Sequence, residues 1–430
     1  MKKGENIQNK SNLSFLIILL IGFVDYLGIG LVYPIFAVLL FDSTHPIVPF
    51  DSSPEYRGAI LGLLIALTPL SQFFCSPILG AFSDLKGRRI ALIIGISAGC
   101  LGYALAIAGI YMNSLGLLFL YRILVGASDA TAAVAQATLA DISTEENKAK
   151  RFAFLNSSFG FGFTVGPFLG GIIADSSIVS WFNYSTPLMA AGLMSLTNLC
   201  LVLWRFPETK MKVKDIQFDF IEGIRNLRRV FMAKHLKWLF LAGFALAFGW
   251  AFFNEFVPLL LSERFSFTLS QIGEYYAFTG ACYALGALLA TRFVHQFTPE
   301  IVAITSLVIA AGCMFLFGLV EHSYYIWWLI PIMMGCLAFA YPTAVTIVSN
   351  KASSESQGEV LGVYHSVGAA AMGLSPLLVG SAIGVYPGLT AWGGAFCLVL
   401  SSLGFWMGRR QNKFLISEKL VSSLEKNQAV

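Results

Sequence analysis

Long stretches without charge restrict what this sequence can fold into. Leu13 to Phe41 holds one charged residue, Asp25, whereas residues 59–82 and 301–320 hold none. Stretches of about 18 or more apolar residues are typical of transmembrane helices, because a helix satisfies its own backbone hydrogen bonds in lipid. The alternating pattern of a membrane β-barrel is absent. Since only 12% of the residues are charged, against about 25% in soluble domains, the sequence predicts an all-α membrane protein.

Twelve transmembrane helices are expected, in two bundles of six. We place them at residues 13–41, 58–82, 90–112, 115–140, 152–174, 186–205, 236–261, 271–292, 301–320, 324–349, 358–383 and 388–407. The predicted domains are an N-terminal bundle (residues 1–205), a cytoplasmic linker (206–235) and a C-terminal bundle with a cytoplasmic tail (236–430). The linker stretch FDFIEGIRNLRRVF has the spacing of an amphipathic helix lying on the inner leaflet.

The two halves show signs of an internal repeat. A shift of 209 residues places four residues of the first half on similar residues of the second: Gly126 on Gly335, Asp141 on Asn350, Pro167 on Pro376, and Gly171 on Gly380. Parallel repeats of this kind occur in transporters, which bind their substrate between the halves.

The positions of Lys and Arg predict that both termini are cytoplasmic. Of the 28 basic residues, all but Arg57, Arg122 and Arg264 lie in the termini and in the loops on one side of the predicted helices, which is the cytoplasmic side by the positive-inside rule. The net charge of +4 reflects this bias and indicates no nucleic-acid partner. The polar N-terminus leads into a retained first helix rather than a cleaved signal peptide.

Several classes of function are disfavoured by missing patterns. The seven cysteines all lie in apolar spans and none has CxxC spacing, so neither disulfides nor a metal site is expected. The sequence lacks GxxxxGK[ST] and HExxH, the patterns of an ATP-binding loop and a zinc protease. We therefore expect no cofactor and no enzymatic activity.

The loop after the second predicted span reads GAFSDLKGRR, from Gly80 to Arg89. It forces a tight hairpin in which Gly80 permits close helix approach and Gly87 permits a positive φ. Asp84 is expected to cap a helix or to pair with Arg88 or Arg89. The alternative is a basic cluster that stops membrane insertion, which would not need the aspartate and the glycines.

The fifth predicted span contains GFTVGPFLGG, in which Gly162, Gly166 and Gly170 recur every four residues. This spacing makes a bare groove that another helix can enter, and Pro167 can bend the helix beside it. Small residues of the eighth span, residues 277–287, offer a partner for this groove. The alternative is ordinary helix packing without a role in gating.

Polar residues also recur within the fourth predicted span. Arg122, Asp129 and Gln136 are seven residues apart and therefore lie on one face of a helix. Charges inside a membrane cost about 2.5–3.5 kcal/mol each on insertion scales and usually face a cavity or a partner. Asp25 in the first span is also a charged residue inside the membrane, so it too is expected to face a cavity or a partner.

These stretches together resemble a known family. The pattern G-x-x-x-D-x-x-G-R-R is similar to the signature loop of the major facilitator superfamily, and DYLGIGLVYP to the first-helix element of its drug:proton antiporters. YRILVGASDATAAVAQATLADIS resembles their fourth helix, with Arg122 and Gly126 as its core, and GFTVGPFLGG, from Gly162 to Gly171, resembles their fifth-helix antiporter motif. The first half is similar to the tetracycline-efflux branch.

The resemblance implies a bacterial inner-membrane antiporter that works as a monomer by alternating access. The first and fourth helices line the central cavity in this family, so Asp25, Arg122 and Asp129 are expected to form a proton-coupling cluster. An inert Arg122–Asp129 ion pair remains the alternative. Gly80, Asp84, Gly87, Arg88 and Arg89 would form the cytoplasmic gate, and Gly162, Gly166, Pro167, Gly170 and Gly171 a rocking interface.

The second half departs from the tetracycline-efflux pattern, because the ninth span has no acidic residue and the eighth has no central histidine. Tetracycline itself is therefore disfavoured as the substrate. Glu255 is either a cavity residue or a residue of the outer mouth, and His365 either titrates near neutral pH or only forms hydrogen bonds. The candidate substrate-cavity residues are Gln136, Trp250, Asn254, Glu255, Tyr283, Tyr341 and His365.

The sequence thus predicts proton-coupled export of a small amphiphilic compound. Export of an endogenous metabolite such as a siderophore and uptake of a nutrient are the alternatives within transport. A receptor or scaffold built on a non-transporting version of the fold is the alternative from another class.

Overall fold

The computed structural model describes residues 2–42, 44–209, 236–293, 296–351 and 357–428, and every regular element in these ranges is a helix. Eleven helical segments are long and apolar enough to cross a membrane. The predicted eighth span forms α12 (Leu269–Phe293), which is less apolar because it carries Gln271, Glu274 and three tyrosines. The prediction of an all-α membrane protein is confirmed.

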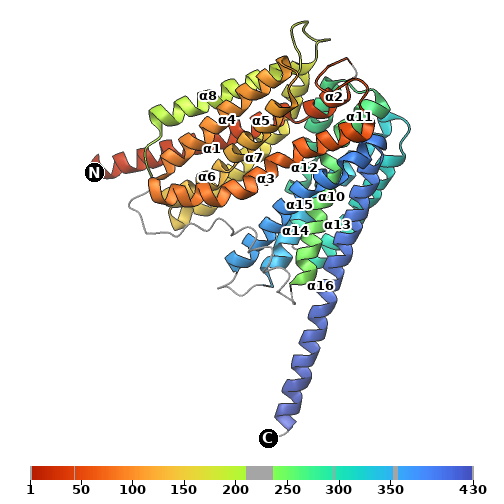
Figure 1. Cartoon of the computed structure of the whole chain (residues 1–430). Helices are drawn as coiled ribbons and strands as arrows, with labels where there is room; N and C mark the ends of the chain where they lie inside the picture. Colours follow the sequence, from red (N-terminus) through yellow and green to blue (C-terminus); the bar gives the residue numbers. More distant parts are fainter. Residues whose placement is uncertain (1, 43, 210–235, 294–295, 352–356, 429–430) are drawn as a thin grey trace. The chain divides into compact units, whose positions relative to one another are not determined.

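In residues 2–42 and 44–209, the first half of the chain forms eight helices, which Figure 1 labels. They are α1 (Lys2–Val32), α2 (Ile35–Phe41), α3 (Pro54–Lys86), α4 (Arg88–Tyr111), α5 (Leu115–Asp129), α6 (Thr131–Ile142), α7 (Glu145–Ala174) and α8 (Thr186–Arg205). The first and fourth predicted spans are therefore each divided in two. The breaks lie at Tyr33–Pro34 and at Ala130.

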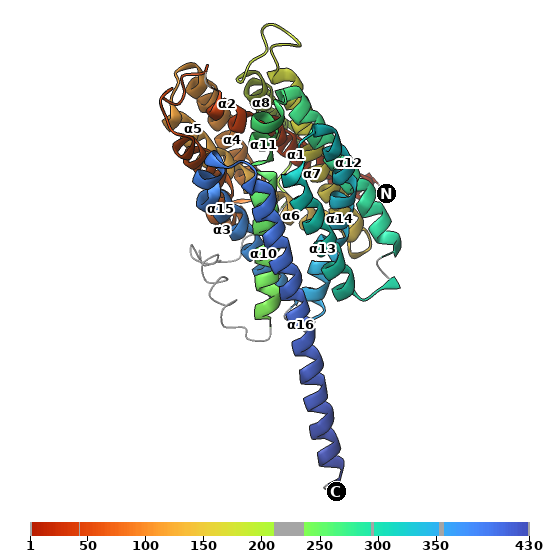
Figure 2. The same ribbon diagram turned by 90° about the vertical axis from the view of Figure 1, so that its right-hand side faces the viewer.

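Over the described residues from 236 onward, the second half contains α12 and seven further elements. These are α10 (Lys237–Asn254), α11 (Val257–Phe265), α13 (Pro299–Leu319), the short 3₁₀ helix η2 (Ser323–Tyr325), α14 (Ile326–Ser349), α15 (Gln357–Val385) and α16 (Leu389–Gln428). The seventh span is divided at Glu255–Phe256, and α16 continues well past the predicted end of its span (Figure 2). The FDFIEGIRNLRRVF stretch and most of the linker lie outside the described residues.

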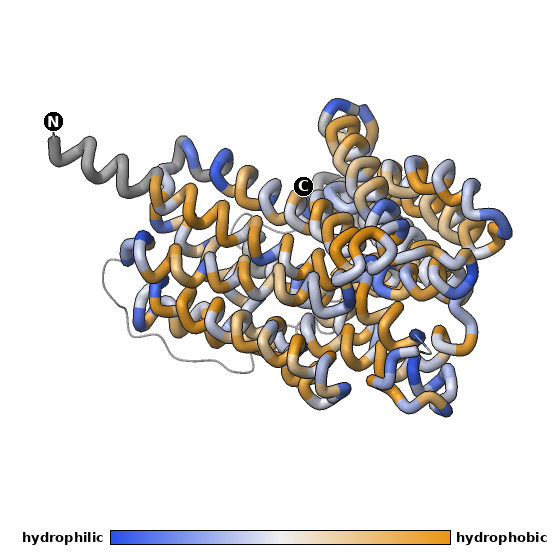
Figure 3. Tube along the Cα trace, turned by 90° about the horizontal axis from the view of Figure 1, so that it is seen from above, coloured by the Kyte–Doolittle hydropathy of each residue, from blue (hydrophilic) through white to orange (hydrophobic). Residues whose placement is uncertain are grey.

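Two compact units account for the packing of the chain. The first unit contains Met1–Gly223 with Glu255–Phe278 and Pro376–Pro387, and the second contains the remaining parts of the second half. Hydrophobic residues run along the helices, with hydrophilic residues gathered near helix ends (Figure 3). The division into bundles at residues 1–205 and 236–430 stays a prediction.

Helix α1 packs along α7 within the first unit. A Cβ atom added to Gly162 would lie 2.6 Å from the carbonyl oxygen of Phe23, and one added to Gly166 would lie 2.6 Å from the Cα of Gly30. One added to Gly170 would meet the carbonyl oxygen of Leu31. The expectation that the eighth span fills this groove was therefore wrong, because α1 occupies it.

Helix α12 instead approaches α7 on the neighbouring face. A Cβ atom on Gly273 would lie 2.8 Å from the carbonyl oxygen of Pro167, and one on Gly171 would meet that of Leu269. The repeat-related pair α3 and α15 meets in the same way, since a Cβ atom on Gly62 would meet the carbonyl oxygen of Pro376. We call these contacts the α7/α12 joint and the α3/α15 joint; they agree with the 209-residue repeat.

The α1–α7 packing generates a testable prediction. Gly170→Ala is expected to lower the melting temperature in detergent by about 2–6 °C, because the added methyl group overpacks a backbone-to-backbone contact. Gly160→Ala is the matched control on the same helix, since a Cβ atom there would have nothing within 4 Å. Equal melting temperatures for the two variants would contradict this account.

Candidate functional site

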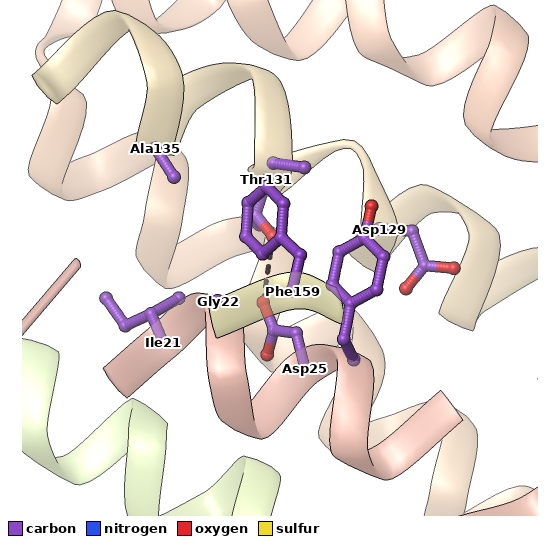
Figure 4. Close-up of a pocket in the computed structure, with 9 residues that line it drawn as sticks. Ile21, Gly22, Asp25, Asp129, Thr131, Ala135 and Phe159 are labelled. Atoms are coloured by element: carbon purple, nitrogen blue, oxygen red, sulfur yellow. Dashed lines mark hydrogen bonds between the residues drawn. The ribbon is translucent and has the colours of Figure 1, made fainter. Parts of the chain in front are cut away.

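Asp25 lies on α1 with hydrogen-bond donors on two other helices. Thr131 Oγ1 donates to its Oδ2 at 3.2 Å, and Asn198 Nδ2 donates to its Oδ1 at 3.3 Å. Figure 4 shows the first of these hydrogen bonds and places Asp25 beside Phe159 of α7. Asn198 also donates to the carbonyl oxygen of Ile21 at 3.3 Å. The carboxylate is thus held by α6 and α8, not left in an apolar surround.

Asp129 is the last residue of α5, directly before the break at Ala130. Gln72 Nε2 donates to the backbone carbonyl oxygen of Asp129 at 3.3 Å and so supplies a partner where the helix is interrupted. Thr131 begins α6 on the other side of the break. The interruption thus places the Asp129 carboxylate and the Thr131 hydroxyl at the same site.

Asp25 and Asp129 both line two small cavities of about 10 Å³ each, roughly the room that one water molecule needs. The first cavity is also lined by Tyr26 and by Phe159, the second of which is labelled in Figure 4. Tyr103 lines the second cavity. Two acidic groups therefore share one polar site in the interior of the first unit. We call Asp25 and Asp129 the acidic pair.

Arg122, the predicted third member of the proton-coupling cluster, forms no hydrogen bond with the acidic pair among the described residues. Its guanidinium carbon is 4.3 Å from the ring centroid of Phe36 and 5.6 Å from that of Tyr121, and its buried Nε has no hydrogen-bond partner. Within the described ranges, Arg122 forms no ion pair with either aspartate. It acts on Asp129 only through its charge, so a closed Arg122–Asp129 ion pair does not describe this conformation.

Glu255 forms a second acidic position in the first unit. It occupies the break between α10 and α11, accepts a hydrogen bond from Tyr33 at the break between α1 and α2, and lies in the field of Arg122. The rings of Tyr33 and Tyr276 are 5.4 Å apart, edge to face. Arg122 therefore interacts electrostatically with both Asp129 and Glu255.

The other predicted cavity residues lie elsewhere. Gln136 is exposed on α6, although it shares a helical face with Arg122 in the sequence pattern. The remaining five belong to the second unit, where His365 is exposed, Asn254 is buried and the others are half-buried: Trp250, Asn254, Tyr283, Tyr341 and His365. Their role in a substrate cavity stays a prediction.

Arg88 is the centre of the predicted gate loop. Its Nε is 2.8 Å from Asp141 Oδ2, its Nη2 is 3.0 Å from Asp84 Oδ1, and its Nη1 donates to Ser83 Oγ at 2.6 Å. Arginine suits this role because its planar fork donates in several directions at once. The loop thus contains a cluster of ion pairs and hydrogen bonds around Arg88, which we call the Arg88 cluster. A basic cluster that only stops membrane insertion would not require these contacts.

Glu208, which sequence reasoning missed, completes this loop. Its carboxylate accepts hydrogen bonds from the backbone N–H groups of Arg88 and Arg89 at 2.9 and 3.1 Å, at the N-terminus of α4. Gly87 has the predicted positive φ, +105°, and a side chain there would collide with Glu208. By contrast, a Cβ atom on Gly80 would have nothing within 4 Å, so the close approach expected there is not found.

Thr131, Asn198 and Gln72 were also missed. Asn198 is the single asparagine of the sixth span, and a polar side chain at membrane depth is itself a signal of a buried partner. Among the described residues, no three His, Cys, Asp or Glu side chains gather in a way that would hold a metal ion.

Residues 18–376 match the family model of the Major Facilitator Superfamily, and the chain therefore belongs to this family of membrane transporters. It is 28% identical over 365 residues to the class E tetracycline resistance protein of Escherichia coli, covering 83% of this chain and 84% of that protein. It is 27% identical over 356 residues to multidrug resistance protein 1 of Bacillus subtilis, covering 81% and 84%. The protein is a multi-pass secondary transporter related to these efflux proteins, and not an enzyme.

Solved structures share the fold. The human organic anion transporter MFSD10 superimposes with a TM-score of 0.65 at 19% identity, covering 92% of this chain and 99% of that one. The D-xylose-proton symporter superimposes with a TM-score of 0.72 at 15% identity, covering 91% and 96%. These identities support the fold alone.

The Arg88 cluster generates the next prediction. Arg88→Lys keeps the charge but cannot reach Asp84, Asp141 and Ser83 together, so transport is expected to fall by about tenfold or more. The measurement is the initial transport rate per folded protein in vesicles. Lys86→Gln is the control, because Lys86 is exposed on the same loop. An Arg88→Lys rate equal to that of the unsubstituted protein would contradict a role for this geometry.

Proposed function

We propose that the protein exports a small amphiphilic compound across the cytoplasmic membrane in exchange for protons, with both termini in the cytoplasm and a monomer as the working unit. The observation that carries the proposal is the acidic pair, which lies within membrane-spanning helices and has no ion-pair partner among the described residues. Such groups are costly in a membrane and usually serve transport of ions or protons.

The environment of the acidic pair suits a change of protonation. Thr131 and Asn198 donate to Asp25 and so favour its ionised form, whereas repulsion between two close carboxylates opposes ionisation of both. The two water-sized cavities beside the pair supply room for proton exchange. A proton or a cationic group of the substrate can therefore relieve the same repulsion, which makes their binding mutually exclusive.

Alternating access supplies the conformational change. A group that is protonated to a different extent in two conformations couples its proton to the equilibrium between them. The Arg88 cluster lies at one end of the first unit, and the α7/α12 and α3/α15 joints provide close backbone contacts that can open and close. We assign Gly162, Gly166 and Gly170 to fixed packing, and Pro167 and Gly171 to the rocking interface.

Similarity to tetracycline and multidrug resistance proteins supports export over nutrient uptake. Export of an endogenous metabolite such as a siderophore uses the same machinery and differs only in the substrate. A compound library tested by thermal shift in detergent separates these cases, since a ligand that binds the folded state raises its melting temperature. A receptor or scaffold would bind a compound but would not move it.

The acidic pair generates the central prediction. Asp25→Asn and Asp129→Asn are each expected to abolish proton movement driven by a compound found in the thermal-shift screen, because neither variant can take up a proton at the substituted position. The measurement is the signal of a pH-sensitive dye inside proteoliposomes when the compound is added.

Asp51→Asn is the control, since Asp51 is exposed in the loop between α2 and α3. Proton movement that persists undiminished in both Asp25→Asn and Asp129→Asn would end the proposal. Loss of movement in the Asp51→Asn control as well would point to a general effect of charge on folding.

A further inference from the structure

Asn198 of α8 holds Asp25 through two hydrogen bonds from one nitrogen atom. Its Nδ2 donates to Asp25 Oδ1 and to the carbonyl oxygen of Ile21, each at 3.3 Å, and its side chain is buried. Both acceptors are oxygen atoms, so the orientation of the amide is fixed and both of its N–H groups are used. Ile21 lies about one turn before Asp25 on α1. Asn198 therefore ties Oδ1 of the carboxylate to a fixed point on the backbone of α1.

Thr131 contacts the other oxygen of the same carboxylate from α6. Its Oγ1 donates to Asp25 Oδ2 at 3.2 Å (Figure 4). Thr131 is the first residue after the break at Ala130, and it lines the first water-sized cavity together with Asp25. Asn198 is not among the described residues that line the two cavities. The first cavity therefore gives a water molecule access to the side of the carboxylate that faces Thr131.

The two donors differ in what they can do once Asp25 is protonated. An amide N–H group only donates, so an oxygen atom that carries a proton cannot keep its hydrogen bond from Asn198. A hydroxyl group both donates and accepts, and it rotates to suit its partner. Thr131 can therefore turn its own proton toward the cavity and accept a hydrogen bond from the new O–H group of Asp25. Asn198 would lose its contact with Asp25 if the proton bound to Oδ1.

We propose that Asp25 takes up its proton on Oδ2, that Thr131 reverses its hydrogen bond to accept from the new O–H group, and that Asn198 is the positioning residue that keeps Oδ1 unprotonated. The inference rests on the proposed proton coupling and adds which oxygen atom binds the proton. The O–H bond forms on Oδ2 as a hydronium ion in the cavity becomes water. Oδ1 is then the carbonyl oxygen and still accepts from Asn198, so the group loses its charge and keeps both neighbours.

The ionisable groups around Asp25 stay in place when either donor is replaced. They are Asp129 and Arg122 of α5, Tyr26 of α1, and Cys100 and Tyr103 of α4. Among the described cavity residues, those that α6, α7 and α8 contribute carry no charge. Replacing Thr131 or Asn198 by an apolar residue therefore changes the hydrogen bonds to Asp25 and leaves the surrounding charges as they are.

Infrared difference spectroscopy detects the proton on Asp25 without substrate or transport. The purified protein in lipid bilayers is titrated from basic to acidic pH, and the carbonyl-stretch band of protonated Asp25 is the one that is missing in Asp25→Asn. A hydrogen bond to the carbonyl oxygen lowers the frequency of this band. Asn198→Leu is expected to raise the frequency, because Oδ1 loses its donor. It should also raise the pH of half-protonation by about one unit, because the ionised form loses a charged hydrogen bond.

Thr131 variants give the contrasting result. In Thr131→Val the ionised form loses a donor and the protonated form loses an acceptor, so the pH of half-protonation should move by less than half as much as in Asn198→Leu. The frequency should also rise less, because Oδ1 keeps its donor. Thr131→Ser keeps the hydroxyl and should titrate like the unsubstituted protein. Thr197→Val is the matched control on α8, since Thr197 is exposed and its hydroxyl donates to the carbonyl oxygen of Leu193 in its own helix.

Two results would overturn the proposal. A larger rise in frequency in Thr131→Val than in Asn198→Leu would place the proton on Oδ1. An unchanged frequency and pH of half-protonation in a folded Asn198→Leu variant would show that Asn198 does not position the carboxylate, and Asn198→Ala serves as the test if the leucine variant fails to fold. A spectrum in which no band depends on Asp25 would overturn the proposed proton coupling as well, whereas a band that is present and unshifted would leave that coupling intact.

Discussion

The cost of placing charge in an apolar membrane interior governs this protein. Asp25, Asp129, Arg122 and Glu255 all lie in segments that have the length and composition of membrane spans, with Glu255 at the break between two helices. Three of these groups are acidic and one is basic, so they cannot be neutralised by pairing alone. Hydrogen bonds from Thr131, Asn198 and Tyr33 carry part of the compensation. Protonation would supply the rest, and this supports the proposed role of the group in proton coupling.

Close packing of backbones is the second constraint, and the antiporter motif of α7 serves it on two faces. Gly162, Gly166 and Gly170 admit α1, a helix of the same half of the chain, whereas Gly171 and the carbonyl oxygen of Pro167 meet α12, a helix of the other half. The first contact joins helices of the same half of the chain, and the second joins helices of different halves. Under the proposed alternating access, one ten-residue motif would contain both a lasting contact and a contact that must break.

The sequence predicted those features that depend on local pattern. The apolar spans, the positive φ of Gly87 and the pairing of Arg88 with Asp84 follow from composition or from residues four positions apart. The breaks at Ala130 and Glu255, by contrast, are stabilised by partners distant in sequence, such as Gln72 and Tyr33. Glu208 lies 120 positions from Arg88. The helix that fills the α7 groove was predicted wrongly because small residues in α1 and α12 suit it equally well by pattern.

Arg122 connects the acidic pair to Glu255 electrostatically. Its charge acts on Asp129 in the acidic pair and on Glu255 at the broken start of α11, while its Nε makes no hydrogen bond that would bind it to either. Protonation of the acidic pair weakens the attraction from one side, and Arg122 then interacts more strongly with Glu255 on the other. Glu255 is hydrogen-bonded to Tyr33, so the field of Arg122 reaches the break between α1 and α2 as well as the break that precedes α11. Both breaks therefore lie within the same set of electrostatic interactions as the acidic pair.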